Sequence, residues 1–437
     1  MLSNSLLRSS FLALTLSPNI FAQSHLDITD ATQRATLALD ALQAWYNPST
    51  GLWETTGWWN SANIMTLIGD FANAHPDNST LQALARNVFA TTLLKAPAKN
   101  PNPGIEDYDS HGKQPGSTGW ASAYTKYLDP GTWEPHTVYP TSWQTASITP
   151  VAAVNSSAPS ASDWLDGYYD DDLWWALAWI TAYDVTFHTP YLTLAEDIFL
   201  AVARTWGTPC FGGGIYWSHS KTYVNAIANS LFFSTAAHLA NRVPFQRQAS
   251  YRSWAERSLD WFLRTGMLND KGTINDGLTG DCRNNGGTTW SYNQGVILGG
   301  LVQLQRAAAP SSPGKQYVAL AEHIANAALA ELSDTNGVLH DECEPDCGAD
   351  GTQFKGIFVR NLVALQGAVA GGGKDGFRRA INANARSIWD NNRVVSEGRG
   401  WNLFSVNWAG PFVGWANAST QSSAMEALVG AVVVPGV

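Results

Sequence analysis

Residues 170–206 read DDDLWWALAWITAYDVTF-HT-PYLTLAEDIFLAVARTW, two apolar blocks that only two residues separate. Apolar side chains recur at three- and four-residue spacing in both blocks, which predicts helices over 170–187 and 190–206. Because the connection His188-Thr189 is so short, the two helices must pack against each other as an antiparallel hairpin. This hairpin is the unit from which the fold can be predicted.

The same period predicts ten more helices along the chain. They run over 28–46, 58–75, 79–95, 222–241, 247–264, 290–308, 313–332, 355–370, 375–391 and 418–432. Connections after the even-numbered helices are short, whereas those after the odd-numbered helices are long and rich in Gly, Trp, Asn and Cys. The long connections are 47–57, 96–169, 207–221, 265–289, 333–354 and 392–417.

Six helical hairpins with their long loops at one end predict an all-α fold, an (α/α)6 barrel with even helices in one ring and odd helices in the other. The long loops then form a functional face, since binding residues favour loops on a rigid scaffold. A solenoid of helix pairs is the alternative, but no repeat of fixed length is visible. We expect one domain over 23–437, with an irregular insertion around 97–163 that is either a lid or a flexible excursion.

Composition restricts the class of ligand. The 437 residues carry a net charge of −10, and only 14% are charged, against roughly 25% in an average domain. An acidic protein repels phosphate backbones, so nucleic acid is not expected as a partner. The 20 tryptophans exceed what a core of this size needs, and indole faces can also stack on sugar rings. A carbohydrate-binding cleft is therefore expected.

Residues 1–22 combine one basic residue with an apolar run and a small residue at the end, which is typical of a signal peptide. No later stretch is long and apolar enough to span a membrane, and residues 430–437 do not resemble a lipid-anchor signal. We therefore expect a secreted, extracellular protein without a membrane anchor. Glycosylation acceptors at Asn78, Asn155 and Asn417 agree with that location.

The four cysteines are Cys210, Cys282, Cys343 and Cys347. An even number in a secreted chain predicts two disulfides, for which three pairings are possible. We prefer Cys343 with Cys347, which closes a tight loop and leaves Cys210 with Cys282. A zinc site is the alternative, but no His/Cys spacing supports it.

Three consecutive aspartates, Asp170 to Asp172, open the helix predicted over 170–187. Aspartates in a first turn often only cap free N–H groups. Here, however, tyrosines precede the triplet and Trp174-Trp175 follow it, so the carboxyls are expected to be partly buried among aromatic side chains. Burial and mutual repulsion should raise the pKa of at least one of them.

A carboxyl pair with split pKa values is what glycoside hydrolysis requires, because one group must donate a proton while the other is ionised. Adjacent residues Asp170 and Asp171 can straddle one anomeric carbon at roughly 5 Å, but they hardly reach the roughly 6.5–9.5 Å of an inverting enzyme. The spacing therefore predicts retention of configuration through a covalent glycosyl-enzyme.

The starts of the even helices repeat aromatic and amide residues that would converge on one rim of the barrel. Candidate substrate-binding residues are Trp58, Trp59, Tyr169, Asp172, Tyr216, Trp217, Asn225, Tyr292, Asn293, Gln294 and Lys355. The aromatic ones could stack on sugars or fill the core, and the amides could bind hydroxyls or satisfy loop carbonyls. Lys355 could also stabilise an ionised aspartate, whereas Trp174 and Trp175 are read as barrel wall.

The run Tyr168-Tyr169-Asp170-Asp171, followed by Trp174, resembles the signature of glycoside hydrolase family 76, the α-1,6-mannanases. Further similar segments are 212–217, 225–229, 292–295, 354–360 and the Cys343-Glu344-Pro345 run before Cys347. The resemblance implies an (α/α)6 barrel and a retaining mechanism. It assigns the nucleophile to Asp170 and the general acid/base to Asp171.

The leading hypothesis is an endo-acting α-1,6-mannanase that cleaves α-mannan or manno-oligosaccharides with two carboxylates, water and no cofactor. A transglycosylase that shares the glycosyl-enzyme is one alternative, and a non-catalytic carbohydrate-binding barrel is another. An unsaturated uronide hydrolase should carry basic residues near the rim to hold the uronate, and few are present there. The sequence does not indicate an oligomeric state.

Overall fold

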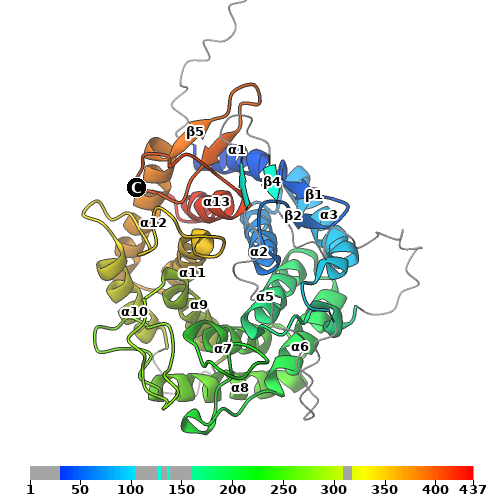
Figure 1. The fold of residues 1–437 in the computed structure, drawn as a ribbon, viewed down its shortest axis with the longest axis vertical. Coiled ribbons are helices and arrows are strands. Elements are labelled where there is room, and N and C mark those ends of the chain that lie inside the picture. Colours follow the sequence, from blue (N-terminus) through cyan, green and yellow to red (C-terminus); the bar gives the residue numbers. More distant parts are fainter. Residues whose placement is uncertain (1–29, 104–125, 129–134, 138–158, 309–316, 437) are drawn as a thin grey trace, which may run out of the picture.

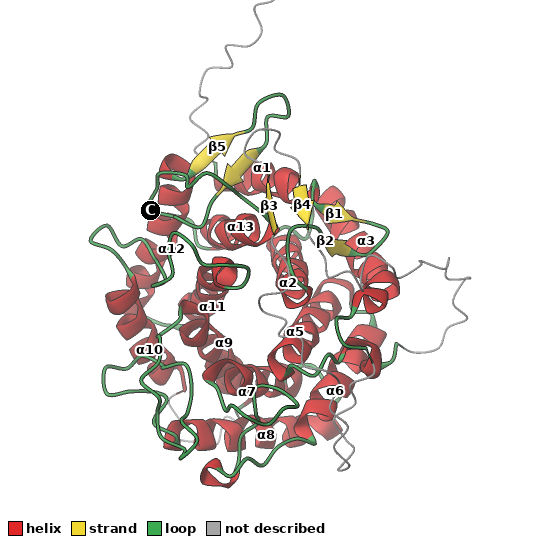
Figure 2. Ribbon diagram, in the orientation of Figure 1, coloured by secondary structure: helices red, strands yellow, loops and turns green. Residues whose placement is uncertain are grey.

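The computed structural model describes residues 30–103, 126–128, 135–137, 159–308 and 317–436. Twelve α-helices in these ranges form two concentric rings (Figures 1 and 2). The inner ring consists of α2 (Trp58–Ala74), α5 (Tyr169–Thr186), α7 (Ala226–Ala240), α9 (Ser291–Ala307), α11 (Phe354–Ala368) and α13 (Ala418–Val433). The outer ring consists of α1 (Ala31–Gln43), α3 (Ser79–Lys95), α6 (Thr189–Ala203), α8 (Phe245–Arg264), α10 (Tyr317–Leu332) and α12 (Gly372–Asn391).

The inner ring is closed, since each inner helix contacts the next and α13 contacts α2. Each outer helix packs against the inner ring. This arrangement confirms the predicted (α/α)6 barrel, with the even-numbered helices of the sequence pattern inside. The predicted boundaries agree within a few residues. The clearest shift is at 222–241, where the helix begins only at Ala226 because the Asn225 side chain accepts from the Ala228 N–H (3.3 Å) and caps it.

Inner and outer helices differ in how much of their surface is buried. Every residue of α7 except His238 is buried, whereas α8 buries only one stripe. The inner helices approach closely at glycines: a Cβ on Gly295 would lie 2.5 Å from the Phe358 Cα, and one on Gly356 would lie 2.6 Å from the Ser423 Cα. Burial on nearly every side is expected of a helix in the inner ring of a double ring, because such a helix has neighbours all round.

The strands of the described residues are short and form three antiparallel hairpins in the long loops. They pair β1 (Tyr46–Asn47) with β2 (Leu52–Trp53), β3 (Lys126–Leu128) with β4 (Pro135–Thr137), and β5 (Arg393–Val395) with β6 (Asn402–Phe404). The 3-10 turns are η1 (Ala96–Lys99), η3 (Ala161–Trp164), η4 (Cys210–Gly212) and η5 (Gly351–Gln353). Most of the predicted 97–163 insertion, all of the predicted 1–22 signal peptide and Asn155 lie outside the described residues.

The structure also bears on the predicted disulfides and glycosylation acceptors. The preferred disulfide pairing is confirmed, since Cys210 is bonded to Cys282 and Cys343 to Cys347. The acceptor at Asn78 is exposed. The expectation for Asn417 is wrong, because this side chain is only 2% exposed and caps α13 by accepting from the Thr420 N–H (2.8 Å). Among the described helices, none has the length and apolar character needed to cross a membrane.

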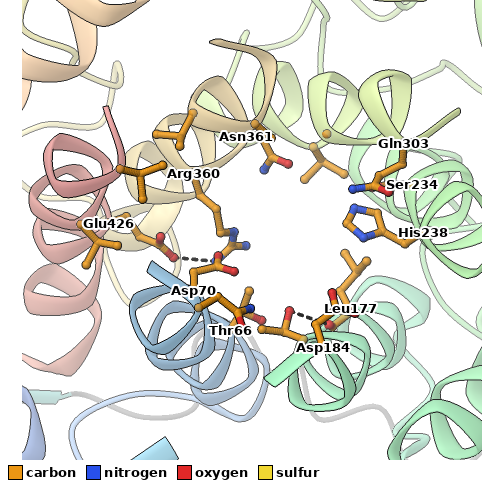
Figure 3. A pocket seen from close by; sticks show the side chains of 18 of the residues that line it. Thr66, Asp70, Leu177, Asp184, Ser234, His238, Gln303, Arg360, Asn361 and Glu426 are labelled. Atoms are coloured by element: carbon orange, nitrogen blue, oxygen red, sulfur yellow. Dashed lines mark hydrogen bonds and ion pairs between the residues drawn. The ribbon is translucent and has the colours of Figure 1, made fainter. Parts of the chain in front are cut away.

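The inner ring encloses a cavity at the end away from the long loops, which we call the basal chamber (Figure 3). It has a volume of about 380 Å³ and lies between the C-terminal halves of the six inner helices. Its polar lining includes Asp70, Asp184, His238, Gln303, Arg360 and Glu426.

Candidate active site

A second cavity lies at the opposite end, where the inner helices begin and the long loops converge; we call it the rim cavity. It has a volume of about 240 Å³. Its lining residues are Trp58, Trp59, Tyr168, Asp170, Asp171, Trp174, Trp217, Tyr223, Asn225, Asp276, Tyr292, Asp350 and Phe354. The structure thus brings the starts of several inner helices together at one rim, as the sequence pattern predicts.

Neighbouring rim loops are hydrogen-bonded to each other through their backbones. The Tyr169 N–H donates to the Trp217 carbonyl (3.0 Å), which joins the start of α5 to the loop after α6. The Ala226 N–H donates to the Asp276 carbonyl (2.8 Å), which joins the start of α7 to the loop after α8. Lining residues that are far apart in sequence are thereby held in fixed positions around one cavity.

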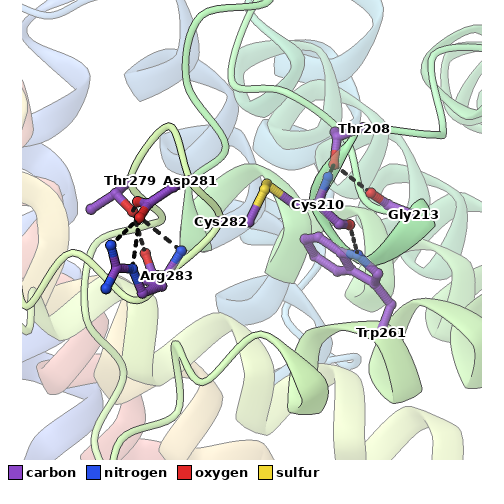
Figure 4. The surroundings of a disulfide bond; sticks show 8 residues. All are labelled: Thr208, Cys210, Gly213, Trp261, Thr279, Asp281, Cys282 and Arg283. Atoms are coloured by element: carbon purple, nitrogen blue, oxygen red, sulfur yellow. Dashed lines mark hydrogen bonds and ion pairs between the residues drawn. A yellow bond between two sulfur atoms is a disulfide. The ribbon is translucent and has the colours of Figure 1, made fainter.

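The Cys210–Cys282 disulfide links the two loops that carry Trp217 and Asp276 (Figure 4). Beside it, the Trp261 indole N–H donates to the Cys210 carbonyl (2.8 Å). Gly214 has φ +75° and lies against the same indole, so an added Cβ would come within 2.2 Å of the ring. The glycine run before Trp217 is therefore required for close packing, and it fixes where that tryptophan enters the cavity.

Amide side chains on the inner helices hold the rim loops in place. Gln294 accepts from the Ile274 N–H (2.7 Å) and donates to the Ile274 carbonyl (2.8 Å). Asn229 makes the same pair of bonds with Ile215, both 2.9 Å. Gln421 accepts from the Phe404 N–H and donates to nearby loop and helix carbonyls. Each of these amides is the fourth residue of its helix, so one position of the barrel serves repeatedly as a loop clamp.

Asp170 lies in the first turn of α5 and reaches into the rim cavity. Its Oδ2 accepts from the Trp217 indole N–H (3.0 Å), while its buried Oδ1 has no partner within the described part of the chain. Burial raises the pKa of Asp170 to about 7, and the Trp217 hydrogen bond opposes that rise by stabilising the ionised form.

Asp171 lines the same cavity but has a different electrostatic environment. Burial raises the pKa of its carboxyl well above the usual range, and repulsion from Asp166, Asp170 and Asp350 raises it further. The Trp217 N–H thus favours the ionised form of Asp170, whereas the neighbouring carboxyls favour the protonated form of Asp171. In such a pair, the protonated carboxyl can donate a proton while the ionised carboxyl attacks an electrophilic carbon in the same cavity.

Asp172 and Tyr169 do not line the rim cavity. Asp172 is 2% exposed, and its Oδ1 accepts from the Asp166 N–H (2.9 Å), so it holds the loop that leads into α5. Burial also raises the pKa of Asp172 well above the usual range. Tyr169 is buried in the core. Both residues shape the start of the helix that presents the other two carboxyls.

Five of the other predicted contact residues line the rim cavity, namely Trp58, Trp59, Trp217, Asn225 and Tyr292. Four do not, namely Tyr216, Asn293, Gln294 and Lys355. Asn293 is fully buried, and both of its amide atoms are without a partner in the described ranges. Lys355 does not pair with the carboxyls of the cavity: it forms an ion pair with Glu344, donates to the Val406 carbonyl (2.7 Å) and lies over the Trp408 ring.

The sequence pattern missed six lining residues, namely Tyr168, Trp174, Tyr223, Asp276, Asp350 and Phe354. Trp174, expected only in the barrel wall, stacks on Trp59 with ring centroids 5.8 Å apart. Asp276 accepts from the Tyr223 hydroxyl, and Asp350 accepts from the Trp59 indole N–H (3.0 Å). Both aspartates lie in long loops that hold several other acidic residues, and loops have no period from which to select one.

The lining of the rim cavity is acidic. Its described residues contribute four carboxyl groups and no Lys, Arg or His side chain. Such a lining repels anionic ligands and accepts neutral ones. Across the described ranges, no group of three or more His, Cys, Asp or Glu side chains could hold a metal ion.

Comparison with known proteins identifies a family. The profile of glycosyl hydrolase family 76 matches residues 134–435. The mannan endo-1,6-alpha-mannosidase DCW1 of Candida albicans is 28% identical over 262 residues, which are 56% of each chain. DCW1 of Saccharomyces cerevisiae is 25% identical over 281 residues, which are 60% of this chain and 59% of that one. These matches span just over half the length of each relative.

Solved structures share the fold. The GH76A alpha-1,6-mannanase of Salegentibacter sp. HEL1_6 is 18% identical, with a TM-score of 0.67 over 92% of this chain and 100% of that one. An inactive variant of that mannanase, with two consecutive aspartates replaced, was solved with alpha-1,6-mannotetrose and has a TM-score of 0.66 at 17% identity, covering 93% and 99%. Dfg5 from Chaetomium thermophilum, in complex with glucosamine, has a TM-score of 0.65 at 18% identity, covering 92% and 90%.

Proposed function

This chain belongs to glycosyl hydrolase family 76, and we propose that it is a retaining endo-α-1,6-mannanase acting on α-mannan. The observation that carries the proposal is the adjacent pair Asp170 and Asp171 in the rim cavity, where burial raises the pKa of both carboxyls and only Asp170 accepts the Trp217 N–H. Two further observations support it. The similar fungal proteins are named as mannan endo-1,6-alpha-mannosidases, and the mannanase with two consecutive aspartates replaced is described as inactive.

In the proposed first step, the ionised Asp170 attacks the anomeric carbon and forms a covalent ester, and the bond to the leaving oxygen breaks. Asp171 gives its proton to that oxygen, which leaves as the hydroxyl of the departing sugar. The Trp217 N–H holds Asp170 Oδ2 and favours the ionised nucleophile. Asp170 Oδ1 has no partner in the described residues, and we assign it the attack.

In the second step, Asp171, now ionised, removes a proton from a water molecule as the water attacks the anomeric carbon. The ester to Asp170 breaks, the sugar leaves with retained configuration, and both carboxyls return to their starting states. The burial that raises the pKa of Asp171 supports this role, because a general acid must hold its proton near neutral pH.

The wall of the rim cavity fits a neutral sugar chain. Trp59 and Trp174 form one stacked pair, and Tyr292 and Phe354 form another with centroids 3.7 Å apart. Aromatic faces pack well against the C–H faces of sugar rings. The four carboxyls, with no cationic side chain beside them among the described lining residues, disfavour a uronate, which argues against an unsaturated uronide hydrolase. The two disulfides of the structure support extracellular action.

Product analysis on linear α-1,6-mannan tests the proposal. We expect the parent protein to release short manno-oligosaccharides, and Asp170→Asn and Asp171→Asn to be inactive while keeping the parent circular dichroism spectrum. Asp172→Asn is the matched control on the same helical turn and should retain most of the activity, because an amide oxygen can still accept from the Asp166 N–H. A folded parent that binds mannan without cleaving it would refute the hydrolase proposal, and products longer than the substrate would indicate transglycosylation.

A further inference from the structure

The basal chamber is unusual for the inside of a helical barrel because charged side chains line it. Protein interiors are normally filled to high density, and buried ion pairs can often be replaced by apolar residues without loss of stability. A charged cavity of about 380 Å³ therefore calls for a functional explanation. Asn73 and Val433, at the ends of α2 and α13, line it and are exposed, so the chamber opens to solvent away from the rim.

Two arginines account for part of this charge. Arg360 on α11 donates to Glu426 on α13 (2.6 Å) and to the side-chain Oδ1 of Asn63 on α2 (2.6 Å). Arg242, just after α7, forms a bidentate pair with Asp184 on α5 (2.8 and 2.7 Å). Arg242 also donates to Gln303 on α9 (3.3 Å). Each arginine thus ties three of the six inner helices together, and neither needs a ligand.

Other polar groups that face the chamber remain unused (Figure 3). Asp70 and the His238 ring have no hydrogen bond or ion pair with any described residue, and Asn361 uses only its N–H₂ group, on the Ile357 carbonyl. Burial lowers the pKa of His238 well below its usual range, so the ring is neutral. A carboxyl, an imidazole and an amide oxygen thus face an open volume without partners.

The lining also indicates the chemistry of a ligand. Both guanidiniums among the described lining residues are already paired, Arg242 with Asp184 and Arg360 with Glu426, and the ring of His238 is neutral, so no cation is left over to hold an anion. No metal-binding cluster is present in the described ranges. Hydroxyl groups can both donate to Asp70 and Asn361 and accept from an imidazole N–H. The lining also includes apolar side chains such as Leu177 and Val296, which can pack against the C–H faces of a sugar ring.

We propose that the basal chamber is a second binding site, for a neutral polyhydroxylated molecule of monosaccharide to disaccharide size. Its volume lies within the range of small-molecule pockets, roughly 300–1,000 Å³. Trp174 lines both cavities, so the indole is a shared wall between the proposed second site and the rim cavity. The proposal does not depend on what the rim cavity cleaves.

This inference is tested by measuring the binding of D-mannose and α-1,6-mannobiose with calorimetry and ligand-observed NMR. The protein is the double variant Asp170→Asn/Asp171→Asn, which should not hydrolyse the sugars. Three substitutions are then added one at a time. Asp70→Asn removes an unpaired charge without changing shape, Ala364→Trp fills the chamber from α11, and Trp217→Ala alters only the rim cavity. D-glucuronate serves as the anionic counterpart of the neutral sugars.

We expect two binding events for a neutral sugar. The event assigned to the chamber should weaken at least tenfold in Asp70→Asn, disappear in Ala364→Trp and persist in Trp217→Ala, and glucuronate should not produce it. A single event that Trp217→Ala abolishes and the chamber variants leave unchanged would overturn the proposal. So would the absence of any binding that responds to Asp70→Asn, a substitution that breaks no contact and should not prevent folding.

Discussion

The hydrogen bond from Trp217 to Asp170 allows the roles of the two aspartates to be tested by pH. Trp217→Phe keeps a flat aromatic ring in the rim cavity but removes the indole N–H that donates to Asp170 Oδ2 at 3.0 Å. A hydrogen bond to a charged group contributes about 1.5–3 kcal/mol, and one pKa unit corresponds to about 1.4 kcal/mol. The pKa of Asp170, about 7 in the parent, should therefore rise by about one to two units.

The consequence is specific to pH. Asp170 must be ionised to attack, so at pH values below its pKa the loss of the bond should lower kcat/KM by about 10- to 100-fold. Above the raised pKa the carboxyl ionises in both proteins, and the deficit should shrink. The acidic limb of the profile of kcat/KM against pH, which reports groups of the free enzyme, should move to higher pH. The assay is hydrolysis of a labelled α-1,6-manno-oligosaccharide.

Trp59→Phe provides the matched control. It also removes an indole N–H bonded to a carboxyl of the same cavity at 3.0 Å, but that carboxyl belongs to Asp350. Its acidic limb should stay in place. If Trp217→Phe lowers kcat/KM equally at every pH, Trp217 only contacts the sugar and the reasoning about Asp170 is wrong. If the basic limb moves instead, the assignments of Asp170 and Asp171 must be exchanged.

Three more predictions concern stability. Cys210→Ser should lower the free energy of unfolding by about 4 kcal/mol and Cys343→Ser by about 2 kcal/mol. The first disulfide spans 72 residues and the second only 4, and a longer closed loop restricts the unfolded chain more. Equal losses in chemical denaturation would contradict this account. Asp170→Asn should stabilise the fold at pH 8 by up to about 4 kcal/mol but not at pH 4. Burial raises the pKa of Asp170 from 3.8 to about 7, so the parent protein is fully stable below pH 4 and loses stability as pH rises through 7, when the buried carboxyl must ionise. A difference in melting temperature that does not change with pH would refute this prediction. Gln294→Leu should cost about 3 kcal/mol, because it leaves the N–H and carbonyl of Ile274 unpaired, and an unchanged melting temperature would show that water replaces the clamp.

The sequence by itself determined the helices, their order and the end of the barrel that carries the long loops. Helical period and loop length are local properties of the chain. Three aspartates between aromatic residues also stand out in one short segment, which is why the sequence could select Asp170 and Asp171, the two that line the rim cavity. The disulfide pairing could be preferred for a similar reason, since Cys343 and Cys347 are close in sequence. These features required no knowledge of contacts between distant segments.

Only the tertiary structure decided how the amide residues at the helix starts are used. Asn225 and Gln294 both lie near the start of an inner helix and were both predicted to bind substrate, yet Asn225 lines the rim cavity whereas Gln294 clamps the loop at Ile274. Asp276 and Asp350 were missed because they reach the cavity from loops separated from α5 by about a hundred residues or more. The local pattern shows which residues are polar. Whether a polar side chain faces the cavity or bonds to a loop backbone depends on contacts between distant segments, which form only when the ring closes.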